Sequence, residues 1–328
     1  MLVNIINVQV QTEQVGLFVV NDFVDEELLD SLSPQCRIVR VNRRPGSRNF
    51  LKILTLNVRL WQFHPDIVHL HSYQVSDILF GRWNMVRTIH NPGNKTTEYR
   101  KMKALYAISD IVRNDVAMKG FPNVTTVNNG IVVGRFKGRT GGKPQNGIYK
   151  MVVTSRLHIE QKGQDILLKA LSRLSKRGIT NFELDLIGEG ASEGVLKEMA
   201  GQLALGDKVR FLGLRSQTFL CQHLCDYDLF VQPSRFDGFG LTVAEAMAAR
   251  LPVLVSDIQG PMEVIGYGQF GMSFKAGDDS DLAEKLEAIL AGGYDYTLIG
   301  KAYRHVGKEY DVALTAQRYL QEYQKVTG

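Results

Sequence analysis

Short apolar runs rich in β-branched residues alternate with amphipathic segments along almost the whole chain. The short runs predict buried strands, and the amphipathic segments predict helices. Strands that alternate with helices are typical of parallel sheets joined by crossover helices. We therefore predict an α/β fold with two doubly wound, Rossmann-like domains that face each other across a cleft. The predicted strands are Val15–Val20, Arg37–Val41, Ile67–His71, Met85–Ile89, Ala107–Ser109, Val124–Val127, Tyr149–Thr154, Phe182–Ile187, Val209–Leu212, Leu229–Gln232 and Pro252–Val255. The predicted helices are Gln164–Lys176, Glu193–Leu203, Leu241–Ala249 and Asp281–Leu290.

The length of 328 residues suits two domains, because single cores stop growing at roughly 250 residues. A glycine-rich polar stretch at 137–147 divides the two sets of elements and predicts an exposed linker. We predict an acceptor-side domain at 1–136 and a donor-binding domain at 148–310. Tyr294–Val326 is helical by period, and we expect residues 311–328 to return to the N-terminal domain. The aromatic residues of the segment Tyr294–Val326 are predicted to pack in the core rather than to take part in chemistry; they are Tyr303, Tyr310, Tyr319 and Tyr323.

The first residues of the chain predict a helix rather than a strand. Leu2–Asn7 has a helical pattern and leads into the strand predicted from Val15. A doubly wound domain normally opens with a buried strand followed by a tight glycine turn, and neither pattern is present at this position. We therefore expect the N-terminal domain to be incomplete and to start within its first helix.

The composition is that of a globular protein, with 44% hydrophobic and 22% charged residues. The net charge of +5 indicates either ordinary solubility or a weak attraction to anionic lipid headgroups or phosphorylated substrates. The densest basic cluster is Arg37–Arg44, followed by Arg48 and Lys52. Nucleic acid is not an expected partner, because the basic residues do not form a long patch interleaved with aromatic residues.

The sequence also indicates a compartment. It contains no run of about 18 apolar residues and no recognisable signal peptide, so we expect neither a membrane span nor secretion. The three cysteines, Cys36, Cys221 and Cys225, suit a reducing cytosol. Two of them flank His223, but no second pair of ligands accompanies them, so no metal site is predicted. We expect a cytoplasmic protein, either free or at the cytoplasmic face of the membrane.

The strongest candidate site follows the predicted strand Leu229–Gln232. Gly238 and Gly240 let the backbone approach a ligand closely. The helix that begins at Leu241 would present free N–H groups to a phosphate. Two carboxylates, Asp237 and Glu245, lie before this helix and about one turn inside it, so both can point into one cleft. The backbone of Phe239 and Thr242 belongs to the same predicted phosphate and hydroxyl site.

A second candidate loop follows the strand Tyr149–Thr154. Arg156 and Lys162 place two cations there, and Gly163 allows a tight turn before the next helix. In parallel sheets, ligands bind at the carboxyl ends of the strands. Two fixed cations can offset the charge of a departing diphosphate without a metal ion. The alternative explanation is ordinary solvated surface charge.

Weaker candidates follow other strands. Gly188 allows close approach of the backbone, although a plain turn explains it nearly as well. Gly213, after another strand, could place main-chain groups against a nucleotide base. His71 and His90 each follow a predicted strand of the first domain. Histidines at strand ends are most often structural, but two of them on neighbouring strands favour a role in substrate contact. Of the two, His90 is the stronger candidate.

Taken together, these motifs resemble the family-4 retaining glycosyltransferases with the GT-B fold. The resemblance covers nearly the whole chain and is strongest in the second half. The motifs that carry it are Ser155-Arg156 with Lys162-Gly163, Ile187–Gly190, Phe211–Gly213 and Pro233–Asp237 with Glu245–Ala248, supported by Tyr106–Ser109, Asn128–Ile131 and Pro261–Ile265.

The resemblance implies a role for each of these residues. Glu245 would hold the ribose hydroxyls of a UDP- or GDP-linked sugar, and Asp237 would lie near the donor sugar. Arg156 and Lys162 would stabilise the departing diphosphate without a metal ion or another cofactor. His90 would contact the sugar near the reacting carbon. The acceptor would be a glycan or a lipid-linked sugar, reached through peripheral contact with the inner membrane.

Two departures from the family pattern are evident. Asp237 replaces the first glutamate of the usual Glu-x7-Glu motif, and the opening strand with its Gly-Gly loop is not found. The second departure leaves open a catalytically impaired protein that binds a nucleotide or a partner transferase. A nucleotide-sugar epimerase is a further alternative, which no feature of the sequence favours.

Overall fold

The computed structural model describes residues 1–72, 75–144 and 147–328. The chain divides into two compact units, each described here by itself. The first unit comprises residues 1–131 and 311–328, and the second comprises residues 132–310. The segment 137–147, which we expected to be a linker, is assigned to the second unit, and its residues 145–146 lie outside the described residues.

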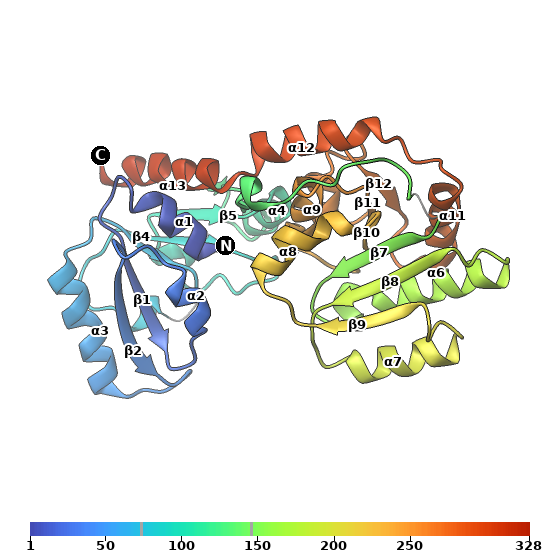
Figure 1. Cartoon of the computed structure of the whole chain (residues 1–328). Coiled ribbons are helices and arrows are strands. Elements are labelled where there is room, and N and C mark those ends of the chain that lie inside the picture. Colours follow the sequence, from blue (N-terminus) through green and yellow to red (C-terminus); the bar gives the residue numbers. More distant parts are fainter. Residues whose placement is uncertain (73–74, 145–146) are drawn as a thin grey trace. The chain divides into compact units, whose positions relative to one another are not determined.

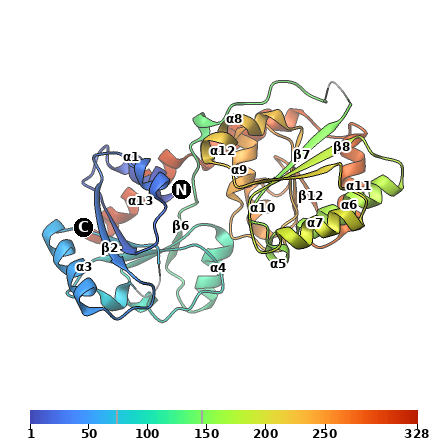
Figure 2. The same ribbon diagram turned by 60° about the horizontal axis from the view of Figure 1, so that its bottom comes forward.

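The second unit contains a six-stranded parallel sheet with the strand order β12-β11-β10-β7-β8-β9. This order is that of a doubly wound fold, in which the chain starts in the middle of the sheet and builds outward in both directions. Figures 1 and 2 show helices on both sides of this sheet. Its strands are β7 (Tyr149–Thr154), β8 (Phe182–Ile187), β9 (Val209–Gly213), β10 (Leu229–Gln232), β11 (Val253–Ser256) and β12 (Met272–Phe274).

The core of the second unit lies between the sheet and its helices. Leu167 and Leu171 of α6 are fully buried with Leu282 and Leu286 of α11, because a spacing of three or four residues keeps apolar side chains on one helix face. The helices of this unit are α5 (Ile159–Lys162), α6 (Gln164–Lys176), α7 (Glu193–Gln202), α8 (Gln217–His223), α9 (Leu241–Ala248), α10 (Gln259–Val264), α11 (Asp279–Leu290) and α12 (Thr297–Glu309), with 3-10 turns η3 (Val133–Arg135) and η4 (Leu224–Asp226).

The first unit contains two parallel sheets, with orders β1-β2 and β3-β4-β5-β6. The predicted initial helix is confirmed as α1, which leads into β1. The strands are β1 (Gly16–Asn21), β2 (Arg37–Arg43), β3 (Val68–Leu70), β4 (Met85–Ile89), β5 (Ala104–Ala107) and β6 (Val124–Thr126). The helices are α1 (Leu2–Gln9), α2 (Glu26–Asp30), α3 (Phe50–Phe63), α4 (Asp110–Met118) and α13 (Val312–Thr327), with 3-10 turns η1 (Ser76–Ile78) and η2 (Tyr99–Lys101). No helix in the described ranges has the length and apolar character needed to cross a bilayer.

One strand prediction was wrong. The strand predicted at Ala107–Ser109 is β5, which ends at Ala107, because Ser109 caps α4 by accepting a hydrogen bond from the N–H of Val112. The segment Tyr294–Val326, which is helical by period, contains two helices, α12 and α13. The side chain of Asp311 accepts from the N–H of Ala313 and so begins a new helix, in which Val312 donates to the carbonyl of Ile131.

Candidate functional site

The strand order of the second unit places two of the predicted loops together. Strand β7 pairs with β8 on one side and with β10 on the other. The connections that leave β7 and β10 run to opposite sides, which creates the crevice in which doubly wound sheets bind ligands. Arg156 and Lys162 lie in the connection after β7, and Asp237 lies in the connection after β10. The fold therefore brings these two candidate loops to the same switch point.

An ion pair joins the two loops. The ammonium of Lys162 lies 2.6 Å from Oδ2 of Asp237, and the two side chains expose only 14% and 17% of their surface. Gln232 at the end of β10 donates to the same oxygen at 2.8 Å, and the N–H of Phe239 donates to the other at 3.3 Å. An ammonium has three N–H donors, so Lys162 can keep this contact and still donate to a ligand.

Helix α9 carries the second predicted carboxylate. Its N-cap is Gly240, which has a φ of 104° and no capping side chain, and the N–H groups of Leu241 and Thr242 have no acceptor within the helix. Glu245 is buried, and Gln217 of α8 donates to its Oε1 at 2.9 Å. Burial raises the pKa of Glu245 to about 6, although the hydrogen bond from Gln217 opposes this rise.

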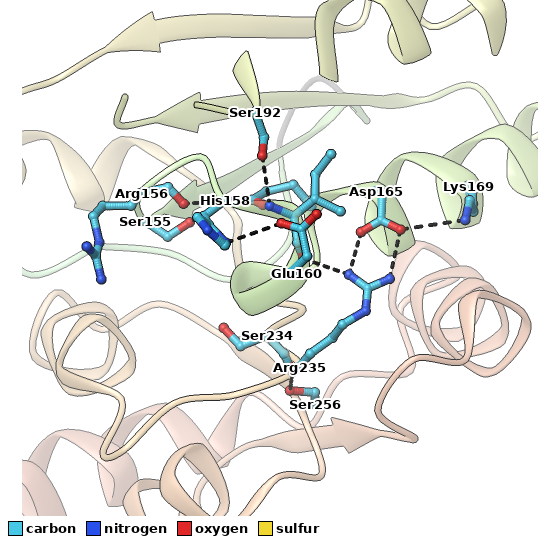
Figure 3. A network of polar contacts seen from close by, with 12 residues as sticks. Ser155, Arg156, His158, Glu160, Asp165, Lys169, Ser192, Ser234, Arg235 and Ser256 are labelled. Carbon is cyan, nitrogen blue, oxygen red and sulfur yellow. Dashed lines mark hydrogen bonds and ion pairs between the residues drawn. The ribbon is translucent and has the colours of Figure 1, made fainter. Parts of the chain in front are cut away.

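Arg156 and its neighbour Arg235 have different surroundings. Arg235 makes a two-pronged ion pair with the buried Asp165 at 2.6 and 2.8 Å and also donates to the carbonyl of Ile159. Burial raises the pKa of Asp165, but Arg235 and Lys169 together outweigh it and hold the pKa below its usual value. Within the part of the chain that the structure describes, Arg156 is exposed and makes no ion pair. Figure 3 shows its side chain extending away from the Asp165–Arg235 pair.

Gly163 fixes the distance between the two loops. Its φ is 62°, and a Cβ at this position would lie 2.0 Å from the carbonyl oxygen of Pro233. We expect Gly163→Ala to lower the free energy of unfolding by more than about 2 kcal/mol, because both the backbone conformation and the neighbouring backbone oppose a side chain. Urea denaturation of the purified variant measures this loss.

The matched control is Gly178→Ala. Gly178 also has a positive φ, 81°, but a Cβ there would meet nothing within 4 Å. Gly178→Ala should lower the free energy of unfolding by only about 1 kcal/mol, because the left-handed backbone alone opposes the side chain. Equal losses for the two variants would show that the contact with Pro233 does not constrain the loops.

The remaining predicted glycines have structural contacts. The N–H of Gly188 donates to the carbonyl of Gly213 at 2.9 Å, which joins the ends of β8 and β9. A Cβ on Gly188 would lie 2.0 Å from the carbonyl oxygen of Ser155, so close packing against the loop after β7 also requires glycine there. Gly238 lies in the connection between β10 and α9. The ring of Phe239 is buried against Tyr310, with ring centres 5.2 Å apart, so this side chain packs within the unit.

The two candidate histidines belong to the first unit and lie together there. His71 follows β3 and His90 follows the neighbouring parallel strand β4, with Nδ1 of His71 at 3.2 Å from Nε2 of His90. Burial, with His90 close by, lowers the pKa of His71 to about 3, and burial followed by the charge of Arg87 lowers the pKa of His90. Both rings are therefore neutral at pH 7. His69 stacks on His71 with ring centres 4.3 Å apart.

The two glutamines that hold the carboxylates were not predicted from the sequence. Gln217 contacts Glu245 and Gln232 contacts Asp237. Gln217 is 28 residues from its partner, and Gln232 lies in a strand whose other residues are apolar. Only the polar residue at the end of that otherwise apolar strand could have pointed to Gln232.

Comparison with known proteins identifies relatives of this chain. Residues 142–306, half of the chain, match the family model described as glycosyl transferases group 1. The chain is 28% identical over 258 residues to glycogen synthase of Mycobacterium tuberculosis, which covers 71% of this chain and 61% of that protein. It is 24% identical over 290 residues to phosphatidyl-myo-inositol mannosyltransferase of Mycobacterium leprae, with coverages of 82% and 76%. The chain thus spans about three fifths of the length of the glycogen synthase.

Solved structures show the same fold. The Anabaena protein Alr3699/HepE, solved in complex with UDP and glucose, has a TM-score of 0.78 at 18% identity, covering 98% of this chain and 95% of that one. A glycosyltransferase from Rickettsia africae has a TM-score of 0.78 at 18% identity, with coverages of 98% and 94%. At this identity the likeness shows the fold alone, and it confirms the predicted α/β fold with two Rossmann-like domains.

Proposed function

Because the chain belongs to the glycosyl transferases of group 1, we propose that it moves a sugar from a nucleoside diphosphate donor to a glycan or lipid-linked acceptor with retention of configuration. The donor would be UDP- or GDP-linked. One matched relative is named for glycogen and another for a lipid, so both acceptor classes belong to the proposal. With a lipid-linked acceptor, the reaction would take place at the cytoplasmic face of the membrane.

The ion pair of Lys162 with Asp237 at the switch point is the observation that supports this proposal most. In the proposed complex, Lys162 and Arg156 donate to the diphosphate, and the N–H groups at the start of α9 face the same charge. These positive groups would take the place that a divalent cation would otherwise fill. Glu245 would accept hydrogen bonds from the ribose hydroxyls, and Asp237 would lie beside the donor sugar.

The proposed reaction needs no base from the protein. The bond between the anomeric carbon and the diphosphate oxygen breaks while the acceptor oxygen bonds to the same carbon from the same face. The acceptor proton passes to the departing phosphate oxygen, and the nucleoside diphosphate leaves. His90, which is neutral at pH 7, would contact the sugar near the reacting carbon through one N–H or one lone pair.

A thermal-shift screen of UDP- and GDP-linked sugars, followed by transfer assays with candidate acceptors, tests this proposal. A bound donor should raise the apparent stability by about 2.7 kcal/mol at a concentration one hundred times its dissociation constant. NMR of the product should show the anomeric configuration of the donor. Failure of every nucleotide to bind would contradict the proposal, whereas tight binding without turnover for any acceptor would favour the nucleotide-binding subunit instead.

A further inference from the structure

Helix α3 of the first unit has two apolar faces. Leu56 and Leu60 are buried on the face that packs against the sheet of β1 and β2, and Asn57 is buried beside them. On the other side lie five exposed apolar residues, which we call the α3 patch: Phe50, Leu51, Leu54, Val58 and Trp61. At 100° per residue these five fall within an arc of about 100°, so they form one continuous stripe along the helix.

The exposure of the α3 patch is large. Leu51 exposes 71% of its surface, Phe50 63% and Trp61 44%. Figure 1 shows α3 on one side of strands β1 and β2, with α2 on the other. A row of exposed aromatic and aliphatic side chains on one helix is typical of a surface that binds another molecule or a membrane.

A neighbouring loop extends the patch. Asn57 donates to the carbonyl of Ile78 at 2.8 Å and accepts from the N–H of Phe80 at 2.6 Å, which fixes this loop against α3. A Cβ on Gly81 would lie 3.6 Å from the indole nitrogen of Trp61 and 3.7 Å from that of Trp83. The chain has only two tryptophans, and both therefore lie at this end of the patch.

The segment that carries the α3 patch is basic, although two of its arginines, Arg40 and Arg44, are paired with Glu26 and Asp22. Residues 31–65 contain no aspartate or glutamate but include seven cations, Arg37, Arg40, Arg43, Arg44, Arg48, Lys52 and Arg59. The net charge of the whole chain is +5, so this segment is much more basic than the remainder. Arg48, Lys52 and Arg59 make no ion pair with any acidic group among the described residues.

We propose that the α3 patch binds an anionic bilayer surface, with its apolar stripe inserted among the lipids and its cations against the headgroups. Helices that combine an apolar stripe, a basic border and a tryptophan lie in the plane of the membrane interface. Nucleic acid would use the cations and the aromatic rings, but it would leave Leu51, Leu54 and Val58 exposed. Such a membrane site would bring the protein to a lipid-linked acceptor, so its role rests on the proposed function. Binding to a bilayer can nevertheless be measured without any donor.

The test measures binding of the full chain to vesicles of phosphatidylcholine alone and to vesicles that also contain phosphatidylglycerol. Flotation should recover the protein only with the anionic vesicles, and added salt should weaken the binding. Because both tryptophans lie at the patch, their fluorescence should shift to shorter wavelength when the vesicles bind.

Two double variants separate the contributions of the apolar stripe and of the charge. Leu51→Ser with Leu54→Ser should lower the partition coefficient on the order of a hundredfold. Arg48→Gln with Lys52→Gln should lower it roughly tenfold. The controls are Leu214→Ser, which changes an exposed leucine of the second unit, and Lys176→Gln with Lys301→Gln. Neither control should change binding, and circular dichroism should show all variants folded.

Several results would overturn the inference. The first is that the unaltered protein does not float with the vesicles, and the second is that neither α3 variant weakens flotation. The third is an affinity for RNA that equals the affinity for vesicles and does not change in the leucine variant. A dimer in sedimentation velocity that Leu51→Ser with Leu54→Ser dissolves would assign the patch to a second copy. Nucleotide binding without lipid should be equal in the unaltered protein and the leucine variant. Its absence in the unaltered protein would contradict the proposed function and leave the vesicle result standing.

Discussion

Lys162→Ala should lower the turnover number for sugar transfer by about two to three orders of magnitude, the usual effect of removing one preorganised donor to developing negative charge. The ammonium of Lys162 is held 2.6 Å from Asp237 at the switch point of the sheet. Charge on the diphosphate grows as the bond to the sugar breaks, so the loss should affect the rate more than the donor KM. Steady-state kinetics with varied donor concentration measure both quantities.

The same substitution has a cost in stability that must be separated from its effect on catalysis. Among the described residues, removal of Lys162 leaves the mostly buried Asp237 with the hydrogen bonds from Gln232 and from the N–H of Phe239. We expect a loss of about 1–3 kcal/mol in the free energy of unfolding. Arg156→Ala should lower the rate without this loss, because Arg156 is exposed and has no ion-pair partner among the described residues.

Lys197→Ala is the matched control. Lys197 makes an ion pair with Glu193 at the same distance, 2.6 Å, but its side chain is 55% exposed and lies on α7. This control should not change the turnover number, and it should change the stability by no more than about 1 kcal/mol, because the exposed ion pair and the contact with the ring of Phe211 are both weak. A Lys162→Ala enzyme that keeps full turnover would remove Lys162 from the proposed reaction.

The part of the site that could be predicted from the sequence depends on chain order. Alternation of strands and helices determines a parallel sheet, and the ends of its strands then carry Arg156, Lys162 and Asp237. The side-by-side placement of His71 and His90 follows from the same rule, since β3 and β4 are parallel neighbours. Strongly periodic segments such as α6 were also predicted with correct bounds, because burial of one face dominates their pattern.

The part that could not be predicted depends on contacts between distant polar residues. Gln217 and Glu245 lie on different helices, and no pattern along the chain joins them. Arg235 is two residues from Asp237, yet it binds Asp165 of α6 and so fixes the loops.

Glu245→Gln should have opposite effects on stability and on function. Burial raises the pKa of Glu245 from 4.5 to about 6 in the folded protein. Between these two pH values the folded state binds more protons than the unfolded state, so the free energy of unfolding falls as the pH rises through this window. The accumulated loss is on the order of 2 kcal/mol above about pH 6, because each unit of pKa shift corresponds to roughly 1.4 kcal/mol.

Glutamine has nearly the same shape and can still accept the hydrogen bond from Gln217, but it carries no charge. The variant should therefore match the unaltered protein near about pH 4 and exceed its stability by about 1–2 kcal/mol near about pH 8. Urea denaturation at both pH values measures the difference. Glu284→Gln on the exposed side of α11 is the control and should leave the pH dependence unchanged.

The same variant should bind the nucleotide donor at least about tenfold more weakly, because hydrogen bonds to a charged acceptor are roughly twice as strong as neutral ones. Calorimetric titration with the nucleoside diphosphate measures this loss. If the free energy of unfolding varied with pH in the same way for the variant and the unaltered protein, ionisation of Glu245 would not destabilise the folded state. A stabler variant that binds the nucleotide equally well would remove the carboxylate from the ribose site. Higher stability with weaker binding would mean that function, and not folding, maintains a charged group at this buried position.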